Sequence, residues 1–260
     1  MNFLLISPPG WGKTTAACSG RLPAMLVDVD CKAAEMNNLK LLIDKGDVVI
    51  YPIKERMVQD RLSDRAKNPA KPPQKMPEGY LHTVDLLNDV LDGNPEYDPF
   101  KTVILDSATR MKEHMIKLLV YHRGQGAFGK KKEDDMNWPS WGSYLANMVE
   151  LFDAMKDLQK DFICTVHQKT IEKTTTTMVG TQVIESTEII GYKPMVDGQF
   201  RDQLAGYFNE CYYMDAKTSG KNPEYRFRTR GTKYDARISL PLDEFEKASI
   251  EHVLRKGGVW

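Results

Sequence analysis

The residues whose types and spacing point to chemistry begin at Ser7, in the segment SPPGWGKTT. This segment fits the phosphate-binding pattern GxxxxGK[ST], in which a flexible backbone turns successive N–H groups toward phosphate oxygens. In that pattern the lysine neutralises phosphate charge and the hydroxyl binds Mg²⁺. Ser7 stands where the pattern has its first glycine, while Gly10 keeps flexibility inside the loop. The alternative is a Gly/Pro turn that holds no ligand. The candidate phosphate-binding residues are Pro9, Gly10, Trp11, Gly12, Lys13, Thr14 and Thr15.

A second candidate group follows the apolar segment VILDS, which ends in Asp106 and Ser107. An apolar strand that ends in a carboxylate has the form of a Walker B element, which orients Mg²⁺ through water. The alternative is an aspartate that only caps a helix or ends a strand. Beside a phosphate-binding loop, the pattern predicts that Thr14 and Asp106 hold the metal.

A water that attacks a phosphate needs a base. The segment LVDVDCK places Asp28 and Asp30 after the next apolar run, two residues apart and so on one face of a strand. Asp30 is the candidate base, within hydrogen-bond reach of the attacking water. Alternatively, either aspartate caps a helix that begins near Lys32.

The segment TVHQ places His167 and Gln168 at the end of a further apolar run. Either side chain would lie near the last phosphate, where it could sense the loss of that phosphate and transmit the change to the next loop. The alternative for His167 is a histidine of the core with its hydrogen bonds satisfied.

Parallel strands must position these residues, because continuous apolar runs with polar ends are typical of strands buried on both faces. Amphipathic segments alternate with these runs, and this rhythm predicts an α/β fold with a mostly parallel central sheet flanked by helices. The predicted strands are 3–7, 24–30, 47–53, 101–107 and 161–168, and the predicted helices are 13–19, 33–44, 79–92, 108–121 and 140–160.

Other segments depart from that rhythm. Residues 64–79 are rich in Pro and Lys, and residues 124–142 combine glycines, a charge run and two tryptophans, so both are predicted to be loops. Residues 169–190 predict a hairpin that turns near Val179-Gly180. Residues 210–216 and 225–239 predict further strands. We expect one domain over 1–260, with a nucleotide-binding core at 1–168 and a β-rich part at 169–260.

The composition is that of a globular protein, with 41% hydrophobic and 28% charged residues. Lys+Arg and Asp+Glu both number 36, so binding to nucleic acid would need a local basic patch. The four cysteines form no CxxC pair and are expected to be buried, reduced thiols. No apolar run approaches the roughly 20 residues that span a bilayer, and we expect a soluble, cytoplasmic protein without a membrane partner.

Taken together, these motifs resemble the RecA-like recombinase core. SPPGWGKTT has the family's loop length and doubled threonine, and ILDSATRM resembles its Asp-Ser Walker B. VDVD is similar to its Asp-x-Glu segment, with Asp30 in place of the catalytic glutamate. HQ is similar to its Asn-Gln switch, which makes Gln168 the expected sensor. The resemblance therefore implies a RecA-like P-loop NTPase fold, with Lys13, Asp30, Asp106 and Gln168 as catalytic residues.

Because the sequence begins directly on the predicted strand before the loop, we expect the recombinases' N-terminal oligomerisation segment to be missing. This compactness, together with KPMVDGQFRDQLAGYFNECYYM and YRFRTRGTKYDAR, looks most like the phage AAA-domain family, which includes Sak-four type single-strand annealing ATPases. The resemblance implies ATP and Mg²⁺ as cofactors and a role in phage DNA recombination, in the host cytoplasm. The partners it implies are single-stranded DNA, further copies of the chain in a ring or filament, and a single-strand binding protein.

Single-stranded DNA binding needs cations for phosphates and aromatic faces for bases. Both occur in residues 123–141, and the predicted hairpin adds two lysines and a run of threonines; these segments fall where the family keeps its DNA-binding loops. The alternatives are a solvated loop, whose acidic run 133–135 partly cancels the charge, and a plain surface hairpin. The candidates are Arg123, Lys130, Lys131, Lys132, Trp138, Lys169 and Lys173.

Cations near the C-terminus fall where the family faces a neighbouring subunit's nucleotide. The candidates for acting in trans are Arg228, Arg230, Lys233 and Arg237. The alternative is that these cations protect a strand edge from aggregation.

Two other functions stay open. A helicase or packaging-type motor of the same fold would show vigorous DNA-stimulated hydrolysis and unwinding. A nucleotide-gated binding module would turn over little, which Ser7 and the shorter carboxylate of Asp30 favour. A nucleotide kinase fits poorly, because no Arg-rich lid follows the Walker B strand.

Overall fold

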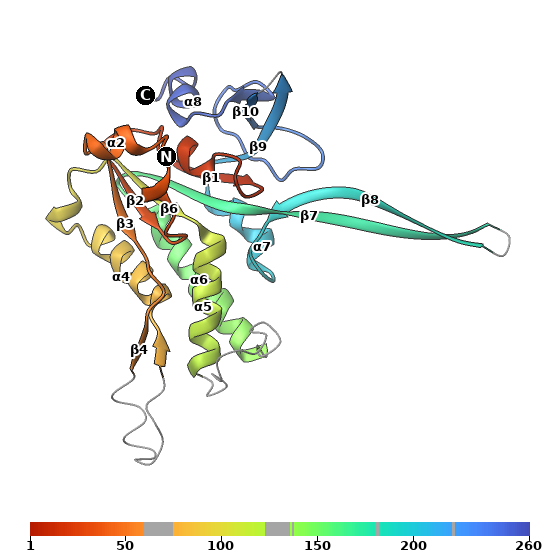
Figure 1. The fold of residues 1–260 in the computed structure, drawn as a ribbon, viewed down its shortest axis with the longest axis horizontal. Helices are drawn as coiled ribbons and strands as arrows, with labels where there is room; N and C mark the ends of the chain where they lie inside the picture. Colours follow the sequence, from red (N-terminus) through yellow and green to blue (C-terminus); the bar gives the residue numbers. More distant parts are fainter. Residues whose placement is uncertain (60–74, 123–135, 137, 180–181, 220–221) are drawn as a thin grey trace, which may run out of the picture.

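A computed structural model of the chain describes residues 1–59, 75–122, 136, 138–179, 182–219 and 222–260. A central sheet lies between two groups of helices, and one long hairpin projects from the body (Figure 1). The predicted α/β fold with a mostly parallel sheet is confirmed.

The order of the strands in the central sheet is β11-β10-β9-β1-β7-β6-β2-β3, and β8 pairs with β7. Neighbouring strands from β9 to β3 run parallel, while β10 and β11 add an antiparallel edge. Strand β7 therefore lies between β1, which precedes the phosphate-binding loop, and β6, which carries Asp106. The strands of this sheet are β1 (Asn2–Ser7), β2 (Ala24–Asp28), β3 (Val48–Pro52), β6 (Thr102–Asp106), β7 (Asp161–Val179), β8 (Gln182–Pro194), β9 (Glu210–Ser219), β10 (Asn222–Arg228) and β11 (Phe245–Lys247).

Helices cover both faces of the sheet. On one face the core contains side chains of α4, α5, α6 and α7, and on the other it contains side chains of α1 and α8, with α2 packed against it. Strand residues alternate between the faces, as Leu4 and Phe3 show. The helices are α1 (Lys13–Ala17), α2 (Lys40–Asp44), α4 (Gly79–Leu91), α5 (Ala108–His122), α6 (Trp138–Lys156), α7 (Phe200–Gln203) and α8 (Ile250–Lys256), with short 3-10 helices η1 (Ala33–Glu35), η2 (Pro95–Tyr97) and η3 (Leu204–Tyr207).

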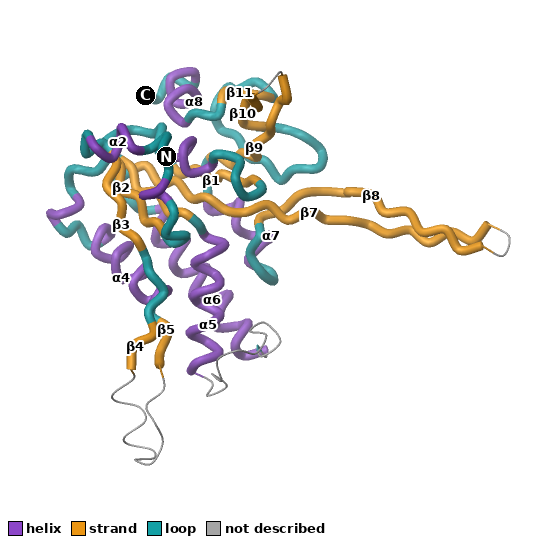
Figure 2. Tube along the Cα trace, in the orientation of Figure 1, coloured by secondary structure: helices purple, strands orange, loops and turns teal. Residues whose placement is uncertain are grey.

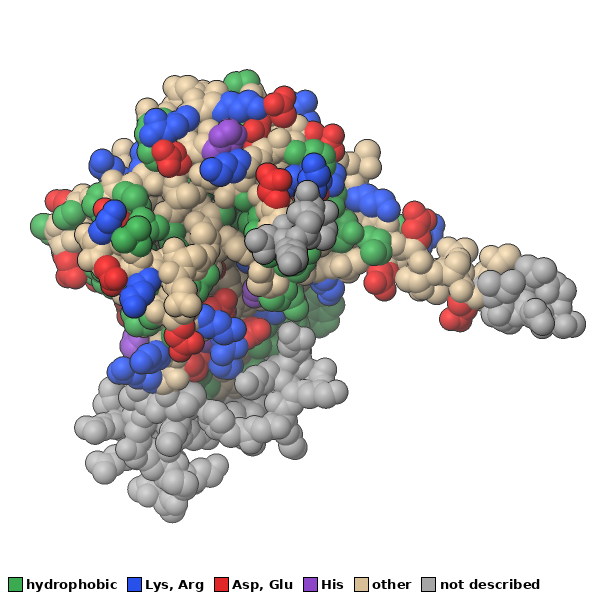
Figure 3. Space-filling model, turned by 45° about the horizontal axis from the view of Figure 1, so that its top comes forward, with side chains coloured by type: hydrophobic (Ala, Val, Ile, Leu, Met, Phe, Trp, Pro, Cys, Tyr) green, Lys and Arg blue, Asp and Glu red, His purple; other side chains and the backbone are tan. Residues whose placement is uncertain are grey.

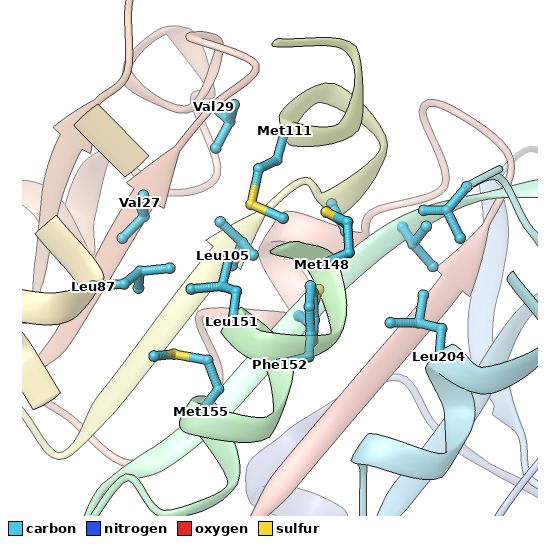
Figure 4. Packing of buried hydrophobic residues seen from close by; sticks show 14 of the residues in the cluster. Val27, Val29, Leu87, Leu105, Met111, Met148, Leu151, Phe152, Met155 and Leu204 are labelled. Atoms are coloured by element: carbon cyan, nitrogen blue, oxygen red, sulfur yellow. The ribbon is translucent and has the colours of Figure 1, made fainter. Parts of the chain in front are cut away.

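The larger of the two cores is centred on α6, whose buried residues pack between the sheet and neighbouring helices (Figure 4). Phe152 is 1% exposed, and its ring lies 5.4 to 6.4 Å from four other aromatic rings. The partner rings are those of Phe162, Phe200, Tyr207 and Phe208. This cluster fixes α6 and the α7–η3 segment against β7.

The projecting hairpin, called the arm below, consists of residues 168–179 of β7 and 182–194 of β8 (Figure 2). Strand β7 runs from the central sheet into the arm as one strand. The pairing shifts register once, between Ile171 and Glu172. The predicted hairpin is therefore confirmed as far as the pair Val179 and Gln182, and residues 180–181, at the expected turn, lie outside the described residues.

Three predicted elements differ from the structure. The helix expected at 33–44 is split into η1 and α2, because Met36 adopts extended backbone dihedrals. The loop expected at 124–142 is contradicted from Trp138 onward, where α6 begins, since Pro139 is tolerated in the first turn of a helix. Residues 124–135 and 137 of this predicted loop lie outside the described residues. The strand expected at 225–239 ends at Arg228, and Gly231 follows in a turn at φ +147°.

The Pro- and Lys-rich segment is described only from residue 75 onward. There β5 (Lys75–Pro77) pairs with β4 (Met57–Gln59) in a separate two-stranded sheet and α4 begins at Gly79, so the prediction of a loop is wrong at these positions. Residues 64–74 of the predicted loop lie outside the described residues.

All four cysteines are free thiols. Three of them are buried as expected, but Cys31 is exposed, because it lies after the end of β2. Among the helices that the structure describes, none combines the length and apolar character needed to cross a membrane.

We expect Phe152→Ala to lower the free energy of unfolding by about 3–5 kcal/mol, because it removes a buried ring and leaves a cavity. Leu41→Ala is the matched control, since Leu41 is 64% exposed and its loss should change stability by about 0.5 kcal/mol or less. Denaturant unfolding of both variants measures the difference. An equal effect of the two substitutions would show that the ring cluster does not fix α6.

Candidate functional site

The residues predicted to bind the nucleotide or act in catalysis lie together at the carboxyl ends of the parallel strands. The register aligns Ser7 of β1 with His167 of β7, and Asp28 of β2 with Asp106 of β6. Ligands of open α/β sheets bind outside these strand ends. The site is therefore where the fold class places it.

The loop after β1 has the backbone that a phosphate-binding loop requires. Gly10 and Gly12 have φ values of +78° and +79°, which favour glycine, and Ser7 remains part of β1. A Cβ built on Gly10 would meet no heavy atom within 4 Å, so the space beside it is open. Gly12 precedes α1 without a side-chain cap, which leaves the first N–H groups of the helix without a side-chain acceptor. These groups are suited to an anion.

The side chain of Lys13 is folded back onto the loop. Its Nζ atom donates to the backbone oxygens of Ser7 at 3.1 Å and Pro8 at 3.0 Å, and to the Ser7 hydroxyl at 3.1 Å. Nζ also lies 3.1 Å from Nδ1 of His167, where the ring nitrogen must accept because an ammonium only donates. Lys13 is 6% exposed.

Burial governs the protonation of this pair. It lowers the pKa of Lys13 to about 8, although Asp106 and Asp30 oppose the change. Burial, followed by the charge of Lys13, also lowers the pKa of His167. The imidazole is therefore neutral at pH 7, and Nδ1 is free to accept from Lys13.

Asp106, the last residue of β6, forms hydrogen bonds with α1, with β7 and with the chain after β2. Its Oδ2 accepts from the Thr14 hydroxyl at 2.6 Å, and its Oδ1 accepts from the Thr165 hydroxyl of β7. The backbone oxygen of Asp106 accepts from the N–H of Val29, which follows β2. The structure thus brings together Thr14 and Asp106, the two predicted metal-binding residues.

The two aspartates after β2 have different roles. Oδ2 of Asp28 accepts from the N–H of Ala33 at 2.8 Å, so Asp28 caps η1 as the alternative interpretation had it. Strand β2 ends at Asp28, so the expectation that both aspartates share a strand face is wrong. Asp30 lies near the Ser107 hydroxyl, at 3.4 Å. Burial and the charge of Asp106 raise the pKa of Asp30.

Asp30 faces a small polar cavity of about 290 Å³ beside the loop. Arg110 in this cavity pairs with Glu113, one turn further along α5. The lining residues are Asp30, Lys32, Thr109, Arg110, Glu113 and His167. The cavity has groups of both charges, which suits a phosphate end together with water.

The structure places His167, not Gln168, against the phosphate-binding loop. Gln168 pairs with Pro194 of β8 at the base of the arm, and alternation along β7 directs the two side chains to opposite faces. The N–H of His167 donates to the Thr109 hydroxyl of α5 at 2.9 Å. His167 therefore links Lys13, α5 and the arm.

Two other threonines complete the site without a signal in the sequence. Thr165 binds Asp106 and Thr109 binds the backbone of β7. Both lie inside segments discussed above, TVHQ and ILDSATRM, but the sequence assigned neither of them a role. Their positions two residues before His167 and three after Asp106 become informative only when the strand order is known.

The DNA-binding candidates are only partly described. Arg123, Lys130, Lys131 and Lys132 lie outside the described residues. Trp138 is the first residue of α6 and is 90% exposed. Lys169 and Lys173 are exposed on the arm.

The four cations proposed to act in trans all have partners within the chain. Arg228 pairs with Asp215 at 3.0 Å and with Glu244 at 3.3 Å. The other three donate to backbone oxygens, namely Arg230 to Leu242, Lys233 to Ile189 and Arg237 to Gly206. A role in trans would require each to exchange these partners.

Comparison with known proteins adds a family. The sequence profile of the AAA domain family matches residues 1–238. No curated protein matches the chain. Among solved structures, the chain is similar to a KaiC-like protein from the archaeon Pyrococcus horikoshii OT3, with a TM-score of 0.43 and 10% identity over 92% of this chain and 81% of that one. It is also similar to the flagellar accessory protein FlaH from Methanocaldococcus jannaschii, with a TM-score of 0.38 and 11% identity over 87% and 76%.

The family match covers nearly the whole length that the site residues span, and the strand order and loop geometry are those of an α/β P-loop NTPase. The chain belongs to the AAA domain family.

Proposed function

We propose that the protein binds ATP with Mg²⁺ and hydrolyses it. The observation that carries this proposal is the 2.6 Å hydrogen bond from the Thr14 hydroxyl to Asp106. A hydroxyl at the start of α1 and a carboxylate at the end of β6 are the two groups that the phosphate-loop mechanism assigns to the metal. In this chain they already lie in contact.

Lys13 would supply the charge for the β- and γ-phosphates. Its present partners are two backbone oxygens, a hydroxyl and a neutral imidazole, and none of these carries a negative charge. A phosphate oxygen is a stronger partner for an ammonium, because the attraction between opposite charges adds to the hydrogen bond. Lys13 would therefore leave the loop when ATP binds.

The residues present fit Mg²⁺. Thr14 and Asp106 offer a hydroxyl and a carboxylate side by side, and Mg²⁺ prefers oxygen ligands shared with substrate phosphates. When bound, the ion would neutralise charge that develops on the transferred phosphate. Thr165 holds the second oxygen of Asp106, so it orients the carboxylate toward Thr14.

Asp30 is the candidate base for the attacking water. It faces the polar cavity next to His167, and its raised pKa makes it a better proton acceptor than an exposed aspartate. Asp28 is not available for this role, because it caps η1.

We further propose that ATP gates binding to single-stranded DNA in an oligomer of the chain, as in phage recombination. Supporting this proposal are the sequence resemblance and the position of the arm, which begins one residue after His167. His167 would take the sensor role expected for Gln168, because it contacts Lys13 directly.

The charge of the arm limits how it would hold DNA. Lys169 and Lys173 alternate with Glu172, Glu185 and Glu188, so the arm has no continuous basic track among its described residues. On the face shown in Figure 3, Lys and Arg are likewise interspersed with Asp and Glu among the coloured residues. Local contacts at the two lysines, rather than a basic surface, would therefore meet the phosphates.

Substitution of the carboxylates tests the proposed chemistry. We expect Asp30→Asn to bind ATP normally and to hydrolyse it roughly 10²–10⁴-fold more slowly, because the base is lost. Lys13→Ala should strongly weaken ATP binding. Asp28→Asn is the matched control and should keep full turnover, since an amide oxygen still accepts from Ala33. Calorimetry measures binding and phosphate release measures turnover. Equal rates for Asp30→Asn and the unaltered protein would contradict the assigned base.

The pH dependence of ATP binding tests the charge of Lys13. Because the pKa of Lys13 is about 8 in the free protein and an anionic ligand raises it, binding takes up a proton above pH 8. We therefore expect ATP affinity to fall as the pH rises through 8, with proton uptake visible in buffers of different ionisation enthalpy. Lys13→Met should bind weakly with no such pH dependence. Constant ATP affinity of the unaltered protein from pH 7 to 9.5 would contradict the proposal that the charge of Lys13 contributes to ATP binding.

Fluorescence anisotropy with labelled single-stranded DNA tests the arm. We expect binding only with ATP. We also expect Lys169→Ala with Lys173→Ala to weaken binding and to reduce the salt slope by roughly 0.7 for each phosphate that a lysine no longer neutralises. Lys193→Ala is the control, since Lys193 is paired with Asp202 at 2.8 Å and Asp235 at 3.3 Å. Equal DNA affinity with and without ATP would contradict the proposed gating. Equal DNA affinity of the double variant and the unaltered protein would contradict DNA binding by the arm.

A further inference from the structure

We propose that Trp11 and Tyr225 form a platform on which the base of the bound nucleotide stacks. The proposal deepens the proposed function and rests on it, because it concerns the same nucleotide. It assigns the ligand class as nucleoside triphosphates of any base, as opposed to inorganic polyphosphates.

The two rings lie together at the phosphate-binding loop. Their centroids are 6.5 Å apart and their planes are inclined by 48°. Tyr225 belongs to β10, which brings a residue more than two hundred positions away to the loop. A Cβ built on Gly12 would lie 3.9 Å from Cδ2 of Tyr225, so the tyrosine closely approaches the loop backbone.

The two rings differ in what else holds them. Tyr225 is half-buried and packs against the hydrophobic cluster that covers α1 and α8. Trp11 is also half-buried, but within the described residues it belongs to neither hydrophobic cluster. Tyr225 is therefore anchored by the core, while Trp11 contacts Tyr225 from outside both hydrophobic clusters of the described residues.

The covalent structure of a nucleotide makes this position suitable for a base. Trp11 lies between the two glycines whose dihedrals shape the phosphate cradle, shortly before Lys13 and Thr14. A triphosphate in that cradle carries its base one ribose beyond the α-phosphate, so the base must lie against the surface beside the loop. An aromatic ring there offers a π-face, and stacking on such a face is favourable for every base.

The ligand class follows from the kind of contact. Stacking uses a feature that all bases share, so it distinguishes a nucleotide from bare polyphosphate but not one base from another. The loop backbone, Lys13 and Thr14 bind the phosphates of both ligands equally. The contribution of the platform is thus the difference in affinity between ATP and inorganic tripolyphosphate.

The test is calorimetric titration with ATP, GTP and inorganic tripolyphosphate, each with Mg²⁺. The variants are Trp11→Ala, Trp11→Phe and Tyr225→Ala. Trp260→Ala is the matched control, because it removes an equally large ring that lies beside Cys18–Leu22, past the far end of α1. Lys13→Ala reports on phosphate binding itself.

We expect Trp11→Ala to weaken ATP and GTP by roughly tenfold or more and to leave tripolyphosphate unchanged. Tyr225→Ala should act in the same direction, while Trp11→Phe should keep most of the affinity and Trp260→Ala all of it. Three results would overturn the platform: equal weakening of ATP and tripolyphosphate, unchanged ATP affinity, or a loss confined to one base. If the unaltered protein binds none of the ligands, or if Lys13→Ala binds them as tightly, the proposed function fails and the platform with it.

Discussion

The carboxylate of Asp106 is the point on which the rest of the site depends. It accepts hydrogen bonds from α1 through Thr14 and from β7 through Thr165, and its backbone oxygen holds the chain after β2. The bond from Thr165 forms because β7 lies beside β6, and the bond from Val29 forms because β2 lies on the other side of β6. Strand β7 also separates β1 from β6 in the sheet. The separation leaves room at the strand ends for the loop to lie over β7 and meet Asp106. A topology with β1 and β6 adjacent would place the same motifs in a different relation.

The concentration of charge at this point has an energetic cost for the folded chain. Asp28, Asp30, Asp106 and Lys13 lie within one region of low water access, and burial shifts the pKa of Lys13 downward and those of Asp28 and Asp30 upward. Burial of charges destabilises a fold unless they are compensated. A ligand that brings its own anionic groups and a cation completes the compensation. By linkage, such a ligand also stabilises the folded state.

The sequence was sufficient to predict the parts of this site that depend on local chemistry. The loop from Gly10 to Thr14, the strand ending in Asp106 and the hairpin of the arm all follow from short motifs and hydrophobic periodicity. The contacts that the sequence did not predict depend on pairing between strands that are far apart in the chain. That His167 rather than Gln168 faces Lys13 depends on the register of β7 against β1, and Thr165 reaches Asp106 only through the same strand order. No local pattern contains that information.

The mispredicted elements have similar causes. Asp28 is ambiguous between base and cap until the position of Ala33 relative to the end of β2 is known. Pro139 lies in a segment whose glycines, charge run and tryptophans favoured a loop, although the first helical turn accepts proline. Strand β10 ends at Arg228, and Gly231 places a turn soon after it in a segment whose composition otherwise favours a strand. In each case one residue supports two local structures, and the surrounding fold selects between them.

The continuity of β7 connects the candidate site mechanically to the arm. One strand passes from the buried centre of the sheet, past His167, to the far end of the arm. A rotation of the strand at its base is therefore enlarged at the tip in proportion to the length of the ribbon. At the register shift between Ile171 and Glu172 the pairing is interrupted, and bending of the arm there would reduce this displacement. A small rotation of β7 beside Lys13 would thus become a larger displacement of Val179.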